Sequence, residues 1–326
     1  MFRRSALSVL VGAGLVLANG ARAEVTPEIG ADIFRASDGT ELPMRSWMPW
    51  ERPRALIVAL HGFADYSVSY ARPAAVWAKQ GIATFAYDQR GFGAAPHVLH
   101  WSSSERMVAD ATEAVAALRA RYPGIPTFLI GESMGGAVAI VATTGPHPAA
   151  VDGVILVAPA VWEHDFLGSI ERTALWVTRA TLPGLWLTPP PGLNIHPSDN
   201  IQMLREMSHD SLVQMGARAD TTAGLMDLMD LAGDEVGRIH LPTLVLYGAH
   251  EEVLPHTAVK TFLDRVPPNN VRVAFYPKGY HMLLRDLDGD IVANDVAAWI
   301  ADRTAPLPSG NECGGDAAAS PPCRHR

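Results

Sequence analysis

The sequence predicts an α/β fold in which helices flank a mostly parallel β-sheet and a helical cap is inserted. Three observations support this prediction. From Ala55 onward, short apolar runs alternate with segments of helical pattern. The runs are rich in Val, Ile and Leu and lack strict alternation, which is typical of strands covered on both faces. Between Pro159 and His240 the alternation stops, which indicates a long insert.

Six of the apolar runs are predicted to be buried strands. They are Ala55–Leu60, Ile82–Tyr87, Thr127–Ile130, Val154–Val157, Thr243–Tyr247 and Val271–Phe275. Strands that alternate with helices form a mostly parallel sheet with helices on both sides.

The clearest helix is predicted over Ser103–Arg121. Ser102 and Glu105 have the spacing of a capping box at its start. The segment 122–124, Tyr-Pro-Gly, ends it, because proline and glycine stop helices.

The insert is predicted to be a helical cap, residues 159–240, that lies over the ends of the strands. It contains Trp162, Trp176 and Trp186 and many Met and Leu residues. Five methionines lie between Met203 and Met229. Two interpretations stay open for them: they line an apolar substrate slot, or they fill the core between cap helices, a role that suits the flexible methionine side chain.

The first 23 residues are predicted to be a cleavable signal peptide, with the mature chain starting near Glu24. Arg3 and Arg4 give a positive start, and a mostly apolar run follows over 6–18. Small residues at Ala21 and Ala23 form a cleavage site. The run is shorter than the ~20 residues that a spanning helix needs. We therefore expect a periplasmic or secreted protein.

The last 23 residues, 304–326, are rich in Pro, Gly, Ala and Ser and are predicted to be a disordered tail. The α/β body is then divided into 24–158 and 241–303, on either side of the cap. Cys313 and Cys323, the chain's two cysteines, lie in this tail. Export permits a disulfide between them, and their pairing stays open. Their position excludes thiol catalysis and cysteine-ligated zinc in the body.

The formal net charge of −8 disfavours nucleic acid as a partner, because a nucleic-acid-binding surface is normally basic. No part of the sequence specifies the oligomeric state.

The strongest motif is a glycine-flanked serine, Gly131-Glu132-Ser133-Met134-Gly135, which follows one predicted strand and opens a helix over 137–144. A nucleophilic serine in the α/β-hydrolase fold stands on such a sharp turn, which exposes its hydroxyl. Flanking glycines avoid a Cβ clash in the crowded turn. Ser133 is therefore the predicted nucleophile.

A serine hydroxyl needs a base, and the base needs an orienting acid. In this fold the acid and then the histidine follow the serine along the chain. His281 follows the last predicted strand, so we predict it as the base. Glu251 follows the strand before it and is the predicted acid, with the adjacent Glu252 as an alternative. Asp286 is a more distant candidate.

The loop that follows the first predicted buried strand, His61-Gly62-Phe63, stands where this fold supplies an oxyanion-hole amide. We predict that the backbone N–H groups of Phe63 and Met134 form the oxyanion hole. The side chain of His61 is predicted to be structural.

Two other motifs are not predicted to take part in catalysis or metal binding. His250 and Glu251 do not form a zinc motif, because position 254 is Leu254 and Pro255 breaks the helix that such a site needs. Asp88 and Arg90 are predicted to hold a loop through charge-assisted hydrogen bonds. We predict no metal and no cofactor.

These residues resemble the monoacylglycerol lipase and lysophospholipase-like group of α/β-hydrolases, also labelled serine aminopeptidase-like. The resemblance runs from about residue 33 to residue 300. The matching segments are 61–67, 87–93, 131–136, 246–248 with Glu251 and Pro255, and 280–281.

The resemblance implies ester hydrolysis of single-chain lipids. The family's nucleophile and base fall on Ser133 and His281, and its oxyanion positions fall on Phe63 and Met134. The family usually has aspartate where this chain has Glu251. Glutamate also serves as the acid of such triads, although its extra methylene changes the reach.

We therefore expect a serine esterase that forms an acyl-enzyme on a monoacylglycerol or lysophospholipid, and whose cap makes transient contact with a membrane surface. One alternative is a peptidase that releases N-terminal residues, although the sequence shows no acidic pocket for an amino terminus. The other is a hydrolase fold that binds without catalysis.

Overall fold

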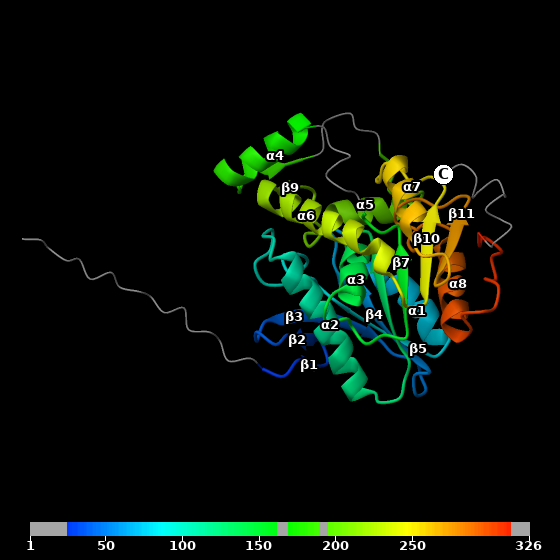
Figure 1. The fold of residues 1–326 in the computed structure, drawn as a ribbon. Coiled ribbons are helices and arrows are strands. Elements are labelled where there is room, and N and C mark those ends of the chain that lie inside the picture. The colour runs from blue at the N-terminus through cyan, green and yellow to red at the C-terminus, as the bar shows by residue number, and fades with distance from the viewer. Residues whose placement is uncertain (1–24, 162–168, 189–194, 314–326) are drawn as a thin grey trace, which may run out of the picture.

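The computed structural model describes residues 25–161, 169–188 and 195–313. Its centre is a nine-stranded sheet in the order β1-β2-β3-β5-β4-β6-β7-β10-β11 (Figure 1). The last six strands in this order pair in parallel, and the six predicted strands are found among them. They are β4 (Ala55–Leu60), β5 (Ile82–Tyr87), β6 (Thr127–Glu132), β7 (Gly153–Val157), β10 (Thr243–Gly248) and β11 (Val271–Tyr276). The predicted α/β fold class is confirmed.

Three antiparallel strands that we did not predict extend one edge of the sheet. They are β1 (Glu28–Ile29), β2 (Ile33–Arg35) and β3 (Glu41–Trp47), and β3 pairs with β5. In β3, buried Leu42 and Met44 alternate with more exposed residues. This edge is covered on one face only, so it lacks the continuous apolar runs of the inner strands.

Two pairs of helices cover the two faces of the sheet. Helices α1 (Ala71–Lys79) and α8 (Gly289–Ala301) pack together on one face, where Trp77 and Trp299 are fully buried. Helices α2 (Ser104–Arg121) and α3 (Met134–Thr144) pack together on the other (Figure 1). The short helices η1 (Ser67–Tyr70) and η3 (Val236–Arg238) and helix α7 (His256–Arg265) complete the body.

The N-terminal cap of α2 differs from the prediction by one residue. Ser103 is the capping residue, and its Oγ accepts a hydrogen bond of 3.1 Å from the N–H of Arg106. The predicted capping box of Ser102 and Glu105 is therefore wrong. In a run of three serines, spacing alone does not identify the capping hydroxyl.

Among the described residues of the insert between β7 and β10 are three α-helices and a small ribbon. The helices are α4 (Ser169–Thr181), α5 (Ile201–His209) and α6 (Ala219–Glu235), and they lie along one end of the sheet (Figure 1). Strands β8 (Trp186–Leu187) and β9 (Ala217–Arg218) form the antiparallel ribbon. Helix α6 packs on α3, which places the cap over the turn that carries Ser133. Within the described ranges, no helix has both the length and the apolar character needed to cross a bilayer.

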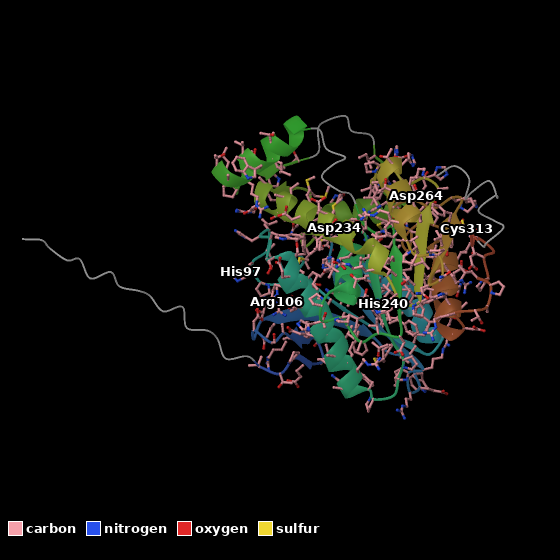
Figure 2. All side chains as sticks on the ribbon, in the orientation of Figure 1. His97, Arg106, Asp234, His240, Asp264 and Cys313 are labelled. Carbon is pink, nitrogen blue, oxygen red and sulfur yellow. The ribbon has the colours of Figure 1, made fainter. Side chains whose placement is uncertain are left out.

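The C-terminal segment is ordered further than predicted. Residues 304–313 were expected to be disordered, but Leu307 is buried and Glu312 forms a β-bridge with Ala274 of the edge strand β11. The N–H of Cys313 donates to the carbonyl of Val273, so Cys313 lies beside β11 (Figure 2). This segment supplies partners to an otherwise open sheet edge. Cys313 is disulfide-bonded, and Cys323 lies outside the described residues, as does the predicted signal peptide.

Candidate active site

Ser133 occupies a strained turn between β6 and α3. Its φ and ψ are 52° and −116°, a conformation that side-chain-bearing residues rarely adopt. The surrounding backbone holds it there: the N–H of Ser133 donates to Val157, and its carbonyl accepts from Ala160, both at 2.9 Å. Strain maintained by its surroundings is common at functional sites.

The glycines beside Ser133 are required by close backbone contacts. A Cβ on Gly131 would lie 2.1 Å from the carbonyl oxygen of Gly135, and a Cβ on Gly135 would lie 2.1 Å from that of Leu60. Both distances are far below van der Waals contact, so neither position accommodates a side chain without a backbone shift.

We expect Gly135→Ala to lower stability by roughly 1–3 kcal/mol, the usual cost of overpacking a tight core. Gly237→Ala is the matched control, because a Cβ there would meet no atom within 4 Å. Thermal unfolding of both variants measures the difference. Equal melting temperatures for Gly135→Ala and the wild type would contradict the role assigned to this glycine.

His281 and Glu251 form a buried pair at the ends of two neighbouring strands. Glu251 follows β10 and His281 follows β11, and His281 Nδ1 lies 2.8 Å from Glu251 Oε2. Glu251 Oε1 accepts hydrogen bonds from the N–H groups of Val253 and Leu254, at 2.8 and 2.9 Å. Both carboxylate oxygens are therefore engaged, and the acid is fixed in one orientation.

The two groups of this pair shift each other's pKa. Burial alone lowers the pKa of His281, but the carboxylate of Glu251 outweighs it and raises that pKa above the ordinary value of 6.5. Burial also raises the pKa of Glu251, but His281 and the two backbone donors lower it overall. The pair thus favours an ionised Glu251 that stabilises a protonated His281.

The alternative acids make other contacts. Glu252 Oε2 accepts from the backbone N–H of His196 at 2.8 Å and lies 3.0 Å from its Nδ1. Asp286 accepts from the hydroxyl of Ser198 at 2.6 Å and from the N–H of Tyr280 at 2.7 Å. Of the three carboxylates considered, it is Glu251 that the structure brings to His281.

His250 stacks on the ring of Tyr280, with 5.1 Å between ring centroids. Among the residues that the structure describes, no group of three or more His, Cys, Asp or Glu side chains is arranged to hold a metal ion.

The loop after β4 brings Phe63 into the same cavity as Ser133. A Cβ added to Gly62 would lie 3.4 Å from the Cβ of Ser133, so the loop passes close to the serine. Met134 is the first residue of α3, where backbone N–H groups have no partner within the helix. Both predicted oxyanion residues therefore lie close to Ser133: Met134 follows it in the chain, and Phe63 lines the same cavity.

His61 supports this loop, as predicted. Its Nε2 accepts from the N–H of Gln89 at 2.9 Å, and its Nδ1 lies 2.8 Å from the carbonyl oxygen of Gly62. Burial lowers the pKa of His61, which favours the neutral ring that this pattern requires.

The next loop, after β5, is held by its charged residues, also as predicted. Asp88 accepts from the N–H groups of Ser67 and Ala94, at 3.0 and 2.9 Å. Arg90 makes a bidentate contact with Asp110, at 2.6 and 3.0 Å.

Ser133 and His281 line a common cavity of about 270 Å³ together with Gly62 and Phe63. A larger cavity of about 720 Å³ adjoins it, and the two share Phe63, Asp65, Pro197, Val253 and Met282. The walls of the larger cavity are mostly apolar and come largely from the cap. Of the five cap methionines, Met207 and Met215 line the larger cavity and Met229 lines the smaller one, which favours the substrate-slot interpretation for these three.

Sequence reasoning missed three charged residues that line the cavity of Ser133 and His281: Asp65, Glu132 and Arg285. All three are buried, and the two carboxylates lie beside the guanidinium of Arg285. The available signal was Glu132 itself, a charged residue at the end of a buried strand. Nothing in the sequence indicated that Asp65 and Arg285, 220 positions apart, would join it.

Comparisons with known proteins show the family to which the chain belongs. The chain matches the family described as serine aminopeptidase, S33, over residues 51–288. It is 25% identical over 273 residues to a monoacylglycerol lipase of Mycolicibacterium smegmatis, covering 83% of this chain and 96% of that protein. It is 26% identical over 286 residues to human monoglyceride lipase, covering 82% of this chain and 89% of that protein.

A crystal structure of Paleococcus ferrophilus monoacylglycerol lipase superposes with a TM-score of 0.67 at 22% identity, covering 81% of this chain and 100% of that one. At this identity the likeness shows the fold alone. The family match spans most of the chain. The chain therefore belongs to the serine aminopeptidase S33 family and is an α/β-hydrolase of the monoacylglycerol lipase-like type.

Proposed function

We propose that the protein hydrolyses carboxylic esters of lipid-like substrates through an acyl-enzyme on Ser133. The observation that carries this proposal is a single cavity lined by a strained, glycine-flanked serine and by a histidine bonded to a buried carboxylate. Such a set is the arrangement that serine hydrolases use on unrelated folds.

In the proposed reaction, His281 accepts the proton of the Ser133 hydroxyl while its oxygen attacks the ester carbonyl carbon. The backbone N–H groups of Phe63 and Met134 stabilise the resulting oxyanion. The tetrahedral intermediate then expels the alcohol, which takes the proton from His281. Water attacks the acyl-enzyme by the same route and releases the acid. Throughout, Glu251 holds the ring of His281 and stabilises its positive charge.

A lipid-like acyl chain suits the cavities. Leu187, Ile195, Leu204, Met207 and Met215 line the larger cavity, and each buried CH₂ group of a substrate contributes roughly 0.8 kcal/mol. The smaller cavity also has charged residues in its lining, Asp65, Glu132 and Arg285, so one end of the site is polar. A monoacylglycerol or a lysophospholipid has this division between an apolar chain and a polar head. Proteins named as monoacylglycerol and monoglyceride lipases are among the relatives.

A substrate panel tests the proposal. Purified protein is offered monoacylglycerols, lysophospholipids, p-nitrophenyl esters and amino-acid amides, with Ser133→Ala as the control. We expect Ser133-dependent release of fatty acid from single-chain lipids. Turnover of amides in preference to esters would favour the peptidase alternative. A protein that turns over no member of the panel and is not labelled at Ser133 by a fluorophosphonate would favour a non-catalytic fold.

The pH dependence should report the His281–Glu251 pair. His281 acts as a base only when neutral, so activity falls as pH drops through its pKa. Because that pKa is raised above 6.5, we expect the acidic limb of kcat/KM above pH 6.5. In Glu251→Gln, which removes the main raising charge, the limb of the residual activity should move to lower pH. A limb at the same pH in both proteins would argue against this pair.

We also propose that the cap touches a membrane surface during catalysis. Several large apolar side chains of the cap are exposed: Trp176, Val177, Leu182, Leu185, Trp186 and Met215. Met215 also lines the larger cavity, so this patch adjoins the proposed acyl site. Exposed apolar groups of this size often mark such contacts.

Replacing Trp176 and Trp186 by serine should weaken flotation with lipid vesicles. Trp50→Ser is the control, because Trp50 is fully exposed in the loop before β4, away from the cap.

Export to the periplasm or medium is likewise a proposal. It rests on Arg3, Arg4, the apolar run 6–18 and the small residues Ala21 and Ala23. N-terminal sequencing of the protein purified from its native host should give a start near Glu24. An intact Met1 on the exported protein would contradict cleavage at this site.

A further inference from the structure

We propose that Arg285 is a positioning residue. It fixes the relative positions of three segments: the oxyanion loop with Phe63, the turn with Ser133 and the loop with His281. The proposal rests on the function proposed above. Arg285 lies four residues after His281, and Asp65 and Glu132, which it contacts, lie two residues after Phe63 and immediately before Ser133. One guanidinium therefore joins the three loops that carry the reacting groups.

The contacts are short and buried. Arg285 Nη2 lies 2.7 Å from Asp65 Oδ2 and 3.5 Å from Glu132 Oε2. All three residues have exposed fractions of 8% or less. Burial opposes the charged form of Arg285, but the two carboxylates raise its pKa, so the guanidinium stays ionised.

Stability alone does not explain this cluster. Burying a charge costs several kcal/mol, and apolar residues of similar volume are often equally stable in such places. The cluster is also incompletely paired: within the part of the chain that the structure describes, Asp65 Oδ2, Glu132 Oε1 and Arg285 Nε are buried and have no hydrogen-bond partner of good geometry, although Asp65 Oδ2 is in ion-pair contact with Arg285. A group retained at this cost beside Ser133 is better explained by the geometry that it imposes.

The oxyanion loop needs such a restraint. Ala64, between Phe63 and Asp65, has φ of 65°, a left-handed conformation that is unfavourable for alanine. Its carbonyl accepts from the N–H of Gln214 in the cap at 2.9 Å. The Asp65–Arg285 ion pair holds the other side of the strained residue. Together they fix the peptide that presents the N–H of Phe63.

Arg285 is itself held from both sides. Its N–H donates to the carbonyl of Met282 at 2.8 Å, and its carbonyl accepts from Asn200 Nδ2 at 2.9 Å. Its Nη1 donates to the sulfur of Met207 at 3.4 Å. The planar guanidinium thus reaches from a cap helix to two carboxylates. A lysine ammonium, a single point charge, does not span these positions.

The charges around His281 make the pH dependence of activity a second test of the proposal. Glu251 and Glu132 raise the pKa of His281, while Arg285 lowers it. Glu132 faces Arg285, Asp65, His281 and Asp286, and Tyr70 is also affected by its charge. Removing the positive charge of Arg285 therefore moves the acidic limb of activity to higher pH. A change in packing alone has no such effect.

The test uses p-nitrophenyl acetate, a short ester that does not need the acyl cavity, with the full-length protein. We expect Arg285→Lys to lower kcat by about 10- to 100-fold, because a displacement of the reacting groups by about 1 Å has an effect of this size. We expect KM to change less than about twofold. We expect Arg285→Met to lower kcat at least as much and to move the acidic limb to higher pH. Arg119→Met, which breaks a surface ion pair with Asp152, is the control and should keep the wild-type kcat.

A triple variant separates positioning from stability, because Arg285→Met alone leaves two unpaired carboxylates and can fail to fold. Asp65→Asn, Glu132→Gln and Arg285→Met together remove all three charges. We expect this variant to fold with a melting temperature near that of the wild type and still show the reduced kcat. Wild-type kcat in either the triple variant or Arg285→Lys would overturn the proposal. Wild-type hydrolysis by Ser133→Ala would instead overturn the function on which it rests.

Discussion

Replacing Ser133 by alanine should lower kcat for ester hydrolysis by about 10⁵–10⁶-fold, the size of effect seen when a serine hydrolase loses its nucleophile. The reason is chemical: alanine has no oxygen to form the acyl-enzyme, and the remaining site supplies only binding and oxyanion stabilisation. The fold should be unaffected, because alanine and serine place the same Cβ in the strained turn and the backbone bonds of residue 133 to Val157 and Ala160 remain.

The measurement is a comparison of kcat, melting temperature and fluorophosphonate labelling between the variant and the wild type. Ser102→Ala is a suitable control, because Ser102 is exposed and lies in the segment before α2. We expect loss of turnover and labelling in Ser133→Ala alone, at an unchanged melting temperature. Comparable turnover in the Ser133 variant would show that the nucleophile lies elsewhere.

The parallel strands could be predicted from the sequence because each is covered on both faces and therefore forms a continuous apolar run. All six were located to within one or two residues of their observed ends. The edge strand β3 was missed, because only one of its faces is buried. Buried Leu42 and Met44 therefore alternate with the more exposed Glu41 and Arg45, and no continuous apolar run results. The tail was misjudged for a different reason. Its composition indicates disorder, but the Glu312–Arg272 ion pair and buried Leu307 fix it to the body.

At the site, the residues that could be predicted from the sequence are those whose proposed chemistry requires a local motif. The turn around Ser133 is such a motif, since its backbone contacts exclude side chains at Gly131 and Gly135. The choice between Glu251 and Glu252 could not be made from the sequence, because adjacent residues in a loop differ mainly in the direction of their side chains. The Asp65–Glu132–Arg285 cluster depends wholly on tertiary contacts, which no local pattern encodes.

Glu251→Gln should lower kcat by about 10³–10⁴-fold, through the tautomer of His281. The oxygen Oε1 of Glu251 accepts from the N–H groups of Val253 and Leu254, while Oε2 faces His281 Nδ1. In the glutamine variant, the single amide oxygen stays with the two backbone donors, so the NH₂ group faces Nδ1. That nitrogen must then accept a hydrogen bond, which places the ring proton on Nε2. A ring protonated there does not accept the proton of Ser133.

Glu252→Gln is the matched control for this change. Its carboxylate faces His196 in the cap, so we expect kcat within about twofold of the wild type.

Glu251→Asp keeps the negative charge and tests the length of the acid side chain. It restores the residue usual in the family, yet its shorter side chain does not span from the two backbone donors to His281, so we expect activity between that of the wild type and Glu251→Gln. Full activity in Glu251→Gln together with a large loss in Glu252→Gln would reverse the assignment. The direction in which each carboxylate points decides between two adjacent glutamates that are chemically identical.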